Sequence, residues 1–155
     1  MTAQFENILP ANSDTLLTIS SFGNMLYQAR GLTQTLSVIG AATQLERTIN
    51  GNLIDLSVAQ FRKYASKITI PNDTAAPPLD GVFPGMSVTV HCAAGFSYVT
   101  GTSGCPHRTV VSGSSYVEGS YTFYRPSLTM LVRSVETQFD EWKNIVGWSL
   151  ELEEV

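Results

Sequence analysis

The sequence is poor in charge and in cysteine, and it has no long apolar run. Only 14% of its 155 residues are charged, against about 25% in an ordinary soluble domain. Two cysteines are too few for a disulfide scaffold. No stretch approaches about 18 consecutive apolar residues, so we expect no membrane-spanning helix and no membrane partner. The opening MTAQFENILP lacks the basic and apolar regions of a secretory signal, so we expect synthesis in the cytoplasm.

Recognisable catalytic motifs are absent as well. His91 and His107 are the only histidines, and no serine lies in a Gly-x-Ser-x-Gly frame, so a hydrolytic triad is not expected. No glycine-rich phosphate loop occurs. We therefore predict no enzymatic activity, no catalytic residues and no cofactor, with a hydrolase that depends on His107 as an alternative. The net charge of −4 gives no support for specific nucleic-acid binding.

The two cysteines lie beside the two histidines, in His91-Cys92 and in Cys105-Pro106-His107. Neighbours on a strand point to opposite faces, so His91 and Cys92 cannot easily bind one ion, and we expect no metal site. Because a free cysteine behaves as a small apolar residue, we expect Cys92 to be buried and Cys105 to lie in a loop. A disulfide between them is the alternative.

Serine, threonine and glycine are abundant, and short apolar segments separate the turns that they favour. This mixture predicts a mainly all-β fold, an antiparallel β-sandwich or barrel of about nine short strands with one short helix. Alternation of apolar and polar residues is clearest over 86–93 and 145–153. The predicted inward faces are Val88, Val90 and Cys92 in the first segment and Val146, Trp148, Leu150 and Leu152 in the second.

Residues 14–155 are expected to form a single domain, preceded by a polar N-terminal arm over 1–13. A long loop over 71–85 carries four of the seven prolines. Residues 116–124 are expected to form one strand, and the aromatic residues near the end of the chain to pack in the core. Those aromatic residues are Tyr121, Phe123, Tyr124, Trp142 and Trp148.

The segment 58–70 fits two structures. Ser57 followed three residues later by Gln60 is a capping box, and apolar positions after it share one helical face. We expect a short helix over 58–65 that leads into a strand at 66–70. The alternative is a strand that already includes Tyr64 and continues to Ile70.

The strongest local signal is the segment Leu45–Leu56, LERTINGNLIDL. Two short runs flank Asn-Gly, the dipeptide that best forms a two-residue type I′ hairpin turn. Such a turn pairs Glu46 with Asp55 and Arg47 with Ile54. The two carboxylates would then lie side by side in solvent, unsuited to acid–base catalysis, and could accept a cation from another copy. Arg47 would share the apolar face, either with its stem packed on the core or as an interface arginine.

Charge is distributed unevenly along the chain. Residues 28–70 hold five cations and two carboxylates, whereas 133–155 hold six carboxylates and two cations. A basic middle and an acidic end are either complementary surfaces between copies or two solvated faces. We predict that charged residues of the middle region lie at an interface between copies. The predicted interface residues are Arg30, Glu46, Arg47, Asp55, Arg62 and Lys63.

Several phrases resemble small virion structural proteins of tailed bacteriophages, from about Arg30 to the end of the chain. They are ARGLTQTL (29–36), RTING (47–51), QFRKY (60–64), LDGVFPG (79–85) and GWSLELEE (147–154). The resemblance implies a non-enzymatic assembly subunit of the virion, made in the bacterial host cytoplasm. A tail component (tube, completion or tip ring) is its first assignment. Head decoration proteins, neck proteins, and a carbohydrate- or receptor-binding module at the tail tip are the alternatives.

The same resemblance implies partners for the chain. They would be copies of itself in a ring and adjacent virion proteins. The arm over 1–13 and the loop over 71–85 would then reach between subunits.

Overall fold

A computed structural model describes residues 16–20, 23–24, 31–40, 44–71, 79–101, 104–142 and 145–155. These residues contain thirteen strands and the 3₁₀ turn η3. In chain order the elements are β1 (Thr18–Ile19), β2 (Gly23–Asn24), β3 (Thr33–Val38), β4 (Leu45–Arg47), β5 (Leu53–Asp55), η3 (Ala59–Phe61), β6 (Tyr64–Pro71), β7 (Ser87–His91), β8 (Phe96–Val99), β9 (Thr109–Val110), β10 (Tyr116–Glu118), β11 (Tyr121–Tyr124), β12 (Pro126–Phe139) and β13 (Ile145–Glu154). The predicted all-β class with antiparallel sheets is confirmed.

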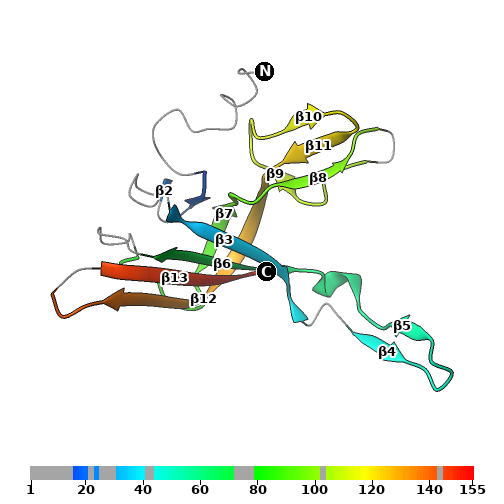
Figure 1. Cartoon of the computed structure of the whole chain (residues 1–155), viewed down its shortest axis with the longest axis horizontal. Coiled ribbons are helices and arrows are strands. Elements are labelled where there is room, and N and C mark those ends of the chain that lie inside the picture. Colours follow the sequence, from blue (N-terminus) through cyan, green and yellow to red (C-terminus); the bar gives the residue numbers. More distant parts are fainter. Residues whose placement is uncertain are drawn as a thin grey trace.

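The largest sheet has eight strands, in the order β2-β1-β7-β12-β13-β6-β3, with β9 also paired to β12. Its long strand β12 pairs with β7 through Ser127–Leu131 and with β13 through Met130–Phe139. The β12–β13 register shifts between Val132 and Ser134, an irregularity of the kind that bends a strand. Figure 1 shows β12 crossing from the small upper sheet to the far end of the molecule.

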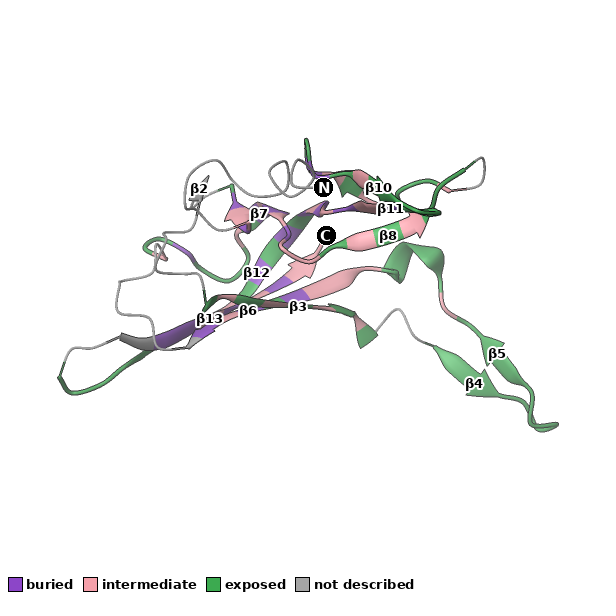
Figure 2. Ribbon diagram, turned by 45° about the horizontal axis from the view of Figure 1, so that its top comes forward, coloured by how far each residue is buried: buried purple, intermediate pink, exposed green. Residues whose placement is uncertain are grey.

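The hydrophobic core lies on one face of this sheet, where every second residue points inward. Val88, Val90, Trp148, Leu150 and Leu152 are all buried, as the alternation predicts. β6 and β12 add further buried side chains, which are Ile68, Ile70, Leu128, Met130 and Val132. The residues between them are more exposed, as the alternating burial along the first half of β12 shows (Figure 2), so one face of the sheet carries the core.

Two contacts join separate parts of the fold. The Gln34 side chain on β3 accepts hydrogen bonds from the backbone N–H of Ala93 (2.8 Å) and of Ala94 (3.2 Å), beyond β7. The three-stranded sheet β10-β11-β8 packs its aromatic rings toward β6, with Phe96 5.4 Å from Tyr64 between ring centroids. The small sheet is therefore fastened to β6, and the edge strand β3 is joined to the segment that follows β7.

Some expected elements differ from the structure. The helix expected over 58–65 is only the 3₁₀ turn η3, and the alternative strand is correct, because β6 begins at Tyr64 and pairs with β13 and β3. Two-sided pairing satisfies more backbone groups than a short isolated helix could. The capping box is not used, since η3 has no side-chain cap. The single strand expected over 116–124 is two strands joined by a turn at Gly119, where φ is +62°.

The aromatic residues also divide differently from the expectation. Trp148 and Tyr124 are buried, as expected, whereas Trp142 is 85% exposed and Tyr121 is 52% exposed. The N-terminal arm over 1–13, residues 72–78 of the proline-rich loop and Arg30 lie outside the described residues. None of the described helical segments is long and apolar enough to cross a membrane.

Candidate interaction surface

The hairpin arm, residues 44–57, consists of β4, β5 and the turn between them. It projects from the body of the molecule and pairs with neither of the other sheets (Figure 1). All its residues are exposed except Ser57, which is half-buried (Figure 2). Its large apolar side chains are 44–106% exposed, and they are Leu45, Ile49, Leu53, Ile54 and Leu56. Such a concentration of exposed apolar groups marks an interaction site.

The arm closes through a three-residue turn, so the predicted two-residue register is wrong by one position. The N–H of Gly51 donates to the Thr48 carbonyl (2.8 Å), and the N–H of Thr48 donates to the Asn52 carbonyl (2.9 Å). Gly51 has φ +82°, the left-handed conformation that follows a type I turn in a three-residue hairpin loop. The hydroxyl of Thr48 also accepts from the N–H of Asn52 (3.1 Å), which favours this loop.

The corrected register changes which side chains share a face. Arg47 pairs with Leu53 and Leu45 pairs with Asp55, whereas Glu46 lies opposite Ile54 on the other face. Glu46 and Asp55 are therefore not opposed, contrary to the expectation. Arg47 is exposed and donates to the Gly51 carbonyl (3.0 Å), so its stem does not pack on the core.

Asp55 is bound within its own segment. Its carboxylate accepts from the N–H of Ser57 (2.8 Å) and lies 3.6 Å from the Arg62 guanidinium. The Ser57 hydroxyl, the Ser57 N–H and then Arg62 hold the pKa of Asp55 below its ordinary value of 3.8. The structure thus brings two predicted interface residues, Asp55 and Arg62, into contact at the base of the arm.

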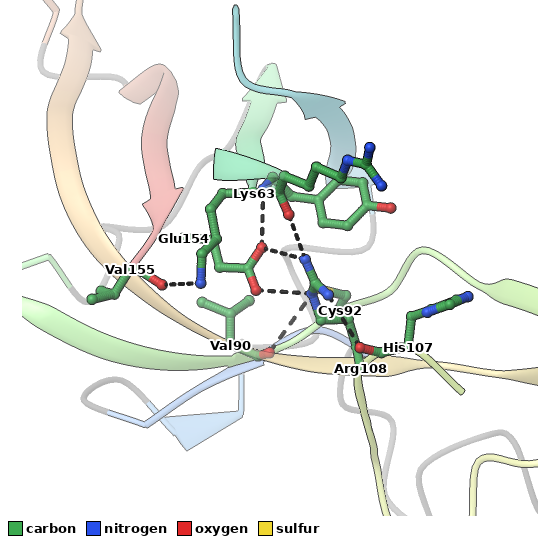
Figure 3. Close-up of polar contacts among 9 residues, drawn as sticks. Lys63, Val90, Cys92, His107, Arg108, Glu154 and Val155 are labelled. Atoms are coloured by element: carbon green, nitrogen blue, oxygen red, sulfur yellow. Dashed lines mark hydrogen bonds and ion pairs between the residues drawn. The ribbon is translucent and has the colours of Figure 1, made fainter. Parts of the chain in front are cut away.

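A polar cluster fixes the chain where it leaves the arm (Figure 3). Glu154 accepts from the N–H of Tyr64 (3.0 Å) and from Nη2 of Arg108 (3.2 Å). Nε of Arg108 lies 2.9 Å from Oε1 of Glu154, and its Nη2 donates to the Arg62 carbonyl (2.8 Å). The guanidinium also lies over the Tyr64 ring, 5.3 Å from the centroid. Lys63 donates to the Val155 carbonyl (2.7 Å). The base of the arm is therefore held against β13.

A groove of about 490 Å³ lies between the arm and the body. We call it the arm-base groove. Its apolar walls are Val38, Leu45 and Tyr64, and its charged groups are Asp55, Arg62 and Lys63, with Ser57 between them. Its volume falls in the range of sites that take a small ligand or a few side chains. Three of the six predicted interface residues line it.

A second cleft, of about 470 Å³, lies beside the polar cluster and is lined by His107, Arg108, Ser127, Thr129 and Glu154 among others. Its Arg108 is already paired with Glu154.

The described residues contain no group of three His, Cys, Asp or Glu side chains suited to a metal ion. Cys92 is buried and Cys105 is exposed, and neither forms a disulfide. Burial raises the pKa of the Cys92 thiol to about 11.

A second exposed apolar feature lies at the turn between β12 and β13. Trp142 and Phe139 are 85% and 61% exposed there. The backbone N–H of Trp142 donates to the Asp140 carboxylate (3.0 Å). We call residues 136–142 the acidic tip, because Glu136, Asp140 and Glu141 lie in it. Sequence reasoning placed Trp142 in the core. Trp142 belongs to the run FDEWKN (139–144), whose polar residues indicate a turn.

Comparisons with protein-family models, with curated proteins and with solved structures find no match.

Proposed function

We propose that this protein is a non-enzymatic structural subunit of a bacteriophage particle, with a tail component (tube, completion or tip ring) as the first assignment. Head decoration and neck proteins are the alternative positions. In this role the protein acts by association with copies of itself and with adjacent virion proteins. The sequence phrases given above support the virion, and the exposed arm supports assembly.

The hairpin arm is the observation that carries the proposal. A two-stranded ribbon is at best marginally stable alone in water, yet this one exposes five large apolar side chains. Four of these side chains are half-exposed and Ile49 is fully exposed. Completing their burial is worth on the order of 5 kcal/mol, before the entropic cost of association. An exposed face of this kind gains most when a neighbouring subunit covers it.

Replacing residues 45–56 by a short Gly-Ser linker tests this role. The arm adds no buried residue to the core, so we expect the variant to fold with an unchanged β-sheet circular dichroism spectrum. We expect it to be excluded from particles, or to block their completion, when it replaces the wild-type protein in infected cells. Mass spectrometry of purified virions measures its incorporation.

The matched control is Tyr121→Ala, which removes an exposed aromatic side chain from the separate sheet β10-β11-β8. This variant is expected to enter particles normally. Absence of the wild-type protein from purified virions would contradict the proposal. Normal incorporation of the linker variant would show that the arm has no part in assembly.

A carbohydrate- or receptor-binding module at the tail tip is the second candidate, and the exposed Trp142 favours it. Aromatic rings form stacking platforms for sugars, and Trp142 presents such a ring at one end of the molecule. Tyr124 is 4% exposed and cannot serve in this way. Glycan-array binding that is lost in Trp142→Ala would favour this function, whereas an array without binding would speak against it.

A further inference from the structure

Two exposed features of the molecule face away from each other. The turn between β12 and β13, which carries the acidic tip, lies at one end of the longest axis, and the hairpin arm lies at the other, with the arm-base groove at its base. Figures 1 and 2 agree on this arrangement. One feature is a protruding aromatic residue, Trp142, and the other is a recess of about 490 Å³. A single copy cannot bring the two together.

We infer that the acidic tip of one copy docks in the arm-base groove of a second copy, so that subunits join head to tail. This inference rests on the proposed function as an assembly subunit and names the surfaces that assemble. The occupant of the groove is therefore another copy of this chain.

The apolar groups of the two surfaces are suited to each other. Trp142 is the largest exposed side chain of the tip, and Phe139 lies close to it in sequence. In the groove, Val38 and Leu45 are 56% and 51% exposed and form walls with Tyr64. Tryptophan is enriched among the residues that dominate binding energy, particularly where a pocket excludes water from it.

The two surfaces differ in net charge, because Arg62 and Lys63 outnumber Asp55 in the groove, whereas the acidic tip holds three carboxylates and no cation. Glu136 and Glu141 belong to the acidic tip. Lys63 in the groove donates to an oxygen of Val155 (2.7 Å), and Arg47 on the arm donates to the Gly51 carbonyl (3.0 Å). None of the ion pairs among the described residues includes Arg47. A tip that enters the groove would bring its carboxylates toward these cations, and opposite charges at an interface fix orientation and speed association.

Head-to-tail contacts have a direct consequence for the size of the assembly. An open chain of copies keeps one free tip at one end and one free groove at the other until a ring closes, so growth continues past the dimer. A ring results if the rotation between copies closes, and an open filament results if it does not. Either product suits a repeated subunit of a particle.

Purified wild-type protein and variants are to be compared by light scattering and analytical ultracentrifugation across a concentration series. We expect the wild type to grow beyond dimers. We expect Trp142→Ala to weaken association by more than about 10-fold, as loss of a central aromatic contact does. Val38→Glu should weaken it similarly, because it places a carboxylate in the groove. Tyr121→Ala, the matched aromatic control, should associate as the wild type does.

A mixture of the two defective variants gives the sharpest test. Trp142→Ala keeps an intact groove and Val38→Glu keeps an intact tip, so together they can form one native contact and no more. We expect a one-to-one heterodimer that does not grow further. Leu45→Glu serves as a second groove variant, and circular dichroism confirms that each variant is folded.

Three results would overturn the inference: a wild type that stays monomeric or stops at a dimer, a Trp142→Ala variant that associates like the Tyr121→Ala control, or a mixture that forms no heterodimer. None of these results removes the protein from purified virions. The proposed function fails only when the particle experiment fails, so the two failures are distinguishable.

Discussion

Arg108 and Glu154 form the most buried ion pair among the described residues, with Nε and Oε1 2.9 Å apart. Their side chains are 24% and 9% exposed, whereas in each of the other three ion pairs both side chains are at least 35% exposed. The pair joins the segment around His107 to β13 and, through the Tyr64 N–H and the Arg62 carbonyl, to the base of the hairpin arm.

Glu154→Gln is expected to destabilise the protein by about 1–3 kcal/mol, because it leaves a partly buried guanidinium without its counter-charge. The control is Glu153→Gln, which breaks the exposed pair with Arg133 and is expected to cost less than about 1 kcal/mol. Urea denaturation measures both changes in the free energy of unfolding. Equal losses for the two variants would contradict the structural role of the Arg108–Glu154 pair.

The register of the hairpin arm predicts particular contacts in solution. Arg47 and Leu53 form a pair without hydrogen bonds between them, since bonded pairs lie on either side at Thr48–Asn52 and Glu46–Ile54. Their α-carbons are therefore expected to be close, and a strong Hα–Hα Overhauser effect should join the two residues. An effect between Thr48 and Leu53 in its place would indicate the two-residue turn, because that register makes them the pair without hydrogen bonds.

The same loop predicts a cost for replacing its glycine. Gly51→Ala places a side chain at φ +82°, which is expected to cost roughly 1 kcal/mol. Amide hydrogen exchange should quicken at Thr48 and Leu56, whose N–H groups bond across the arm. Gly40→Ala is the control, because that glycine has no positive φ and open space around it. Equal exchange in both variants would contradict the loop geometry.

Asp55 is expected to titrate below 3.8, and its contribution to stability has a definite sign. Because the folded pKa is lowered, the stabilisation is fully present above the ordinary pKa and is lost as the pH falls through the folded value. Ser57→Ala should raise the pKa of Asp55 more than Arg62→Gln does, since the Ser57 hydroxyl is the larger cause. Carbon-detected NMR titration measures these values. The reverse order would contradict the assignment.

The two cysteines are expected to differ sharply in reactivity. Cys105 is exposed and should react with Ellman's reagent in the folded protein, whereas the buried Cys92 should not. Burial holds the Cys92 pKa near 11, so the reactive thiolate is scarce at neutral pH. Both thiols should react after denaturation, and Cys105→Ser should remove the fast reaction. A fast reaction of Cys92 in the folded state would show that the core opens.

Alternation predicted the core strands well because the two-residue period is local. Val88, Val90, Trp148 and Leu150 face the core as their sequence pattern indicates. The same local pattern could not choose between helix and strand for 58–65. That choice depended on β13 and β3, which lie beside β6 and are distant in sequence.

The candidate interaction surface was predicted in part. The sequence located the hairpin and named Asp55, Arg62 and Lys63, which line one groove. It gave Glu46 and Arg47 the wrong partners, because Asn-Gly also fits a three-residue loop in which glycine alone takes the left-handed conformation. It also missed the exposure of Trp142, which follows from β12 continuing to Phe139.

By itself, the sequence determined the β class, the inward faces of the main strands and the presence of a hairpin. Each of these depends on residues close together in the chain. Tertiary structure decided that the hairpin projects from the body, that a groove forms at its base and that Trp142 is exposed in the β12–β13 turn, which lies at the opposite end of the molecule. These features depend on which distant strands pair and where their pairing stops, so no local pattern contains them.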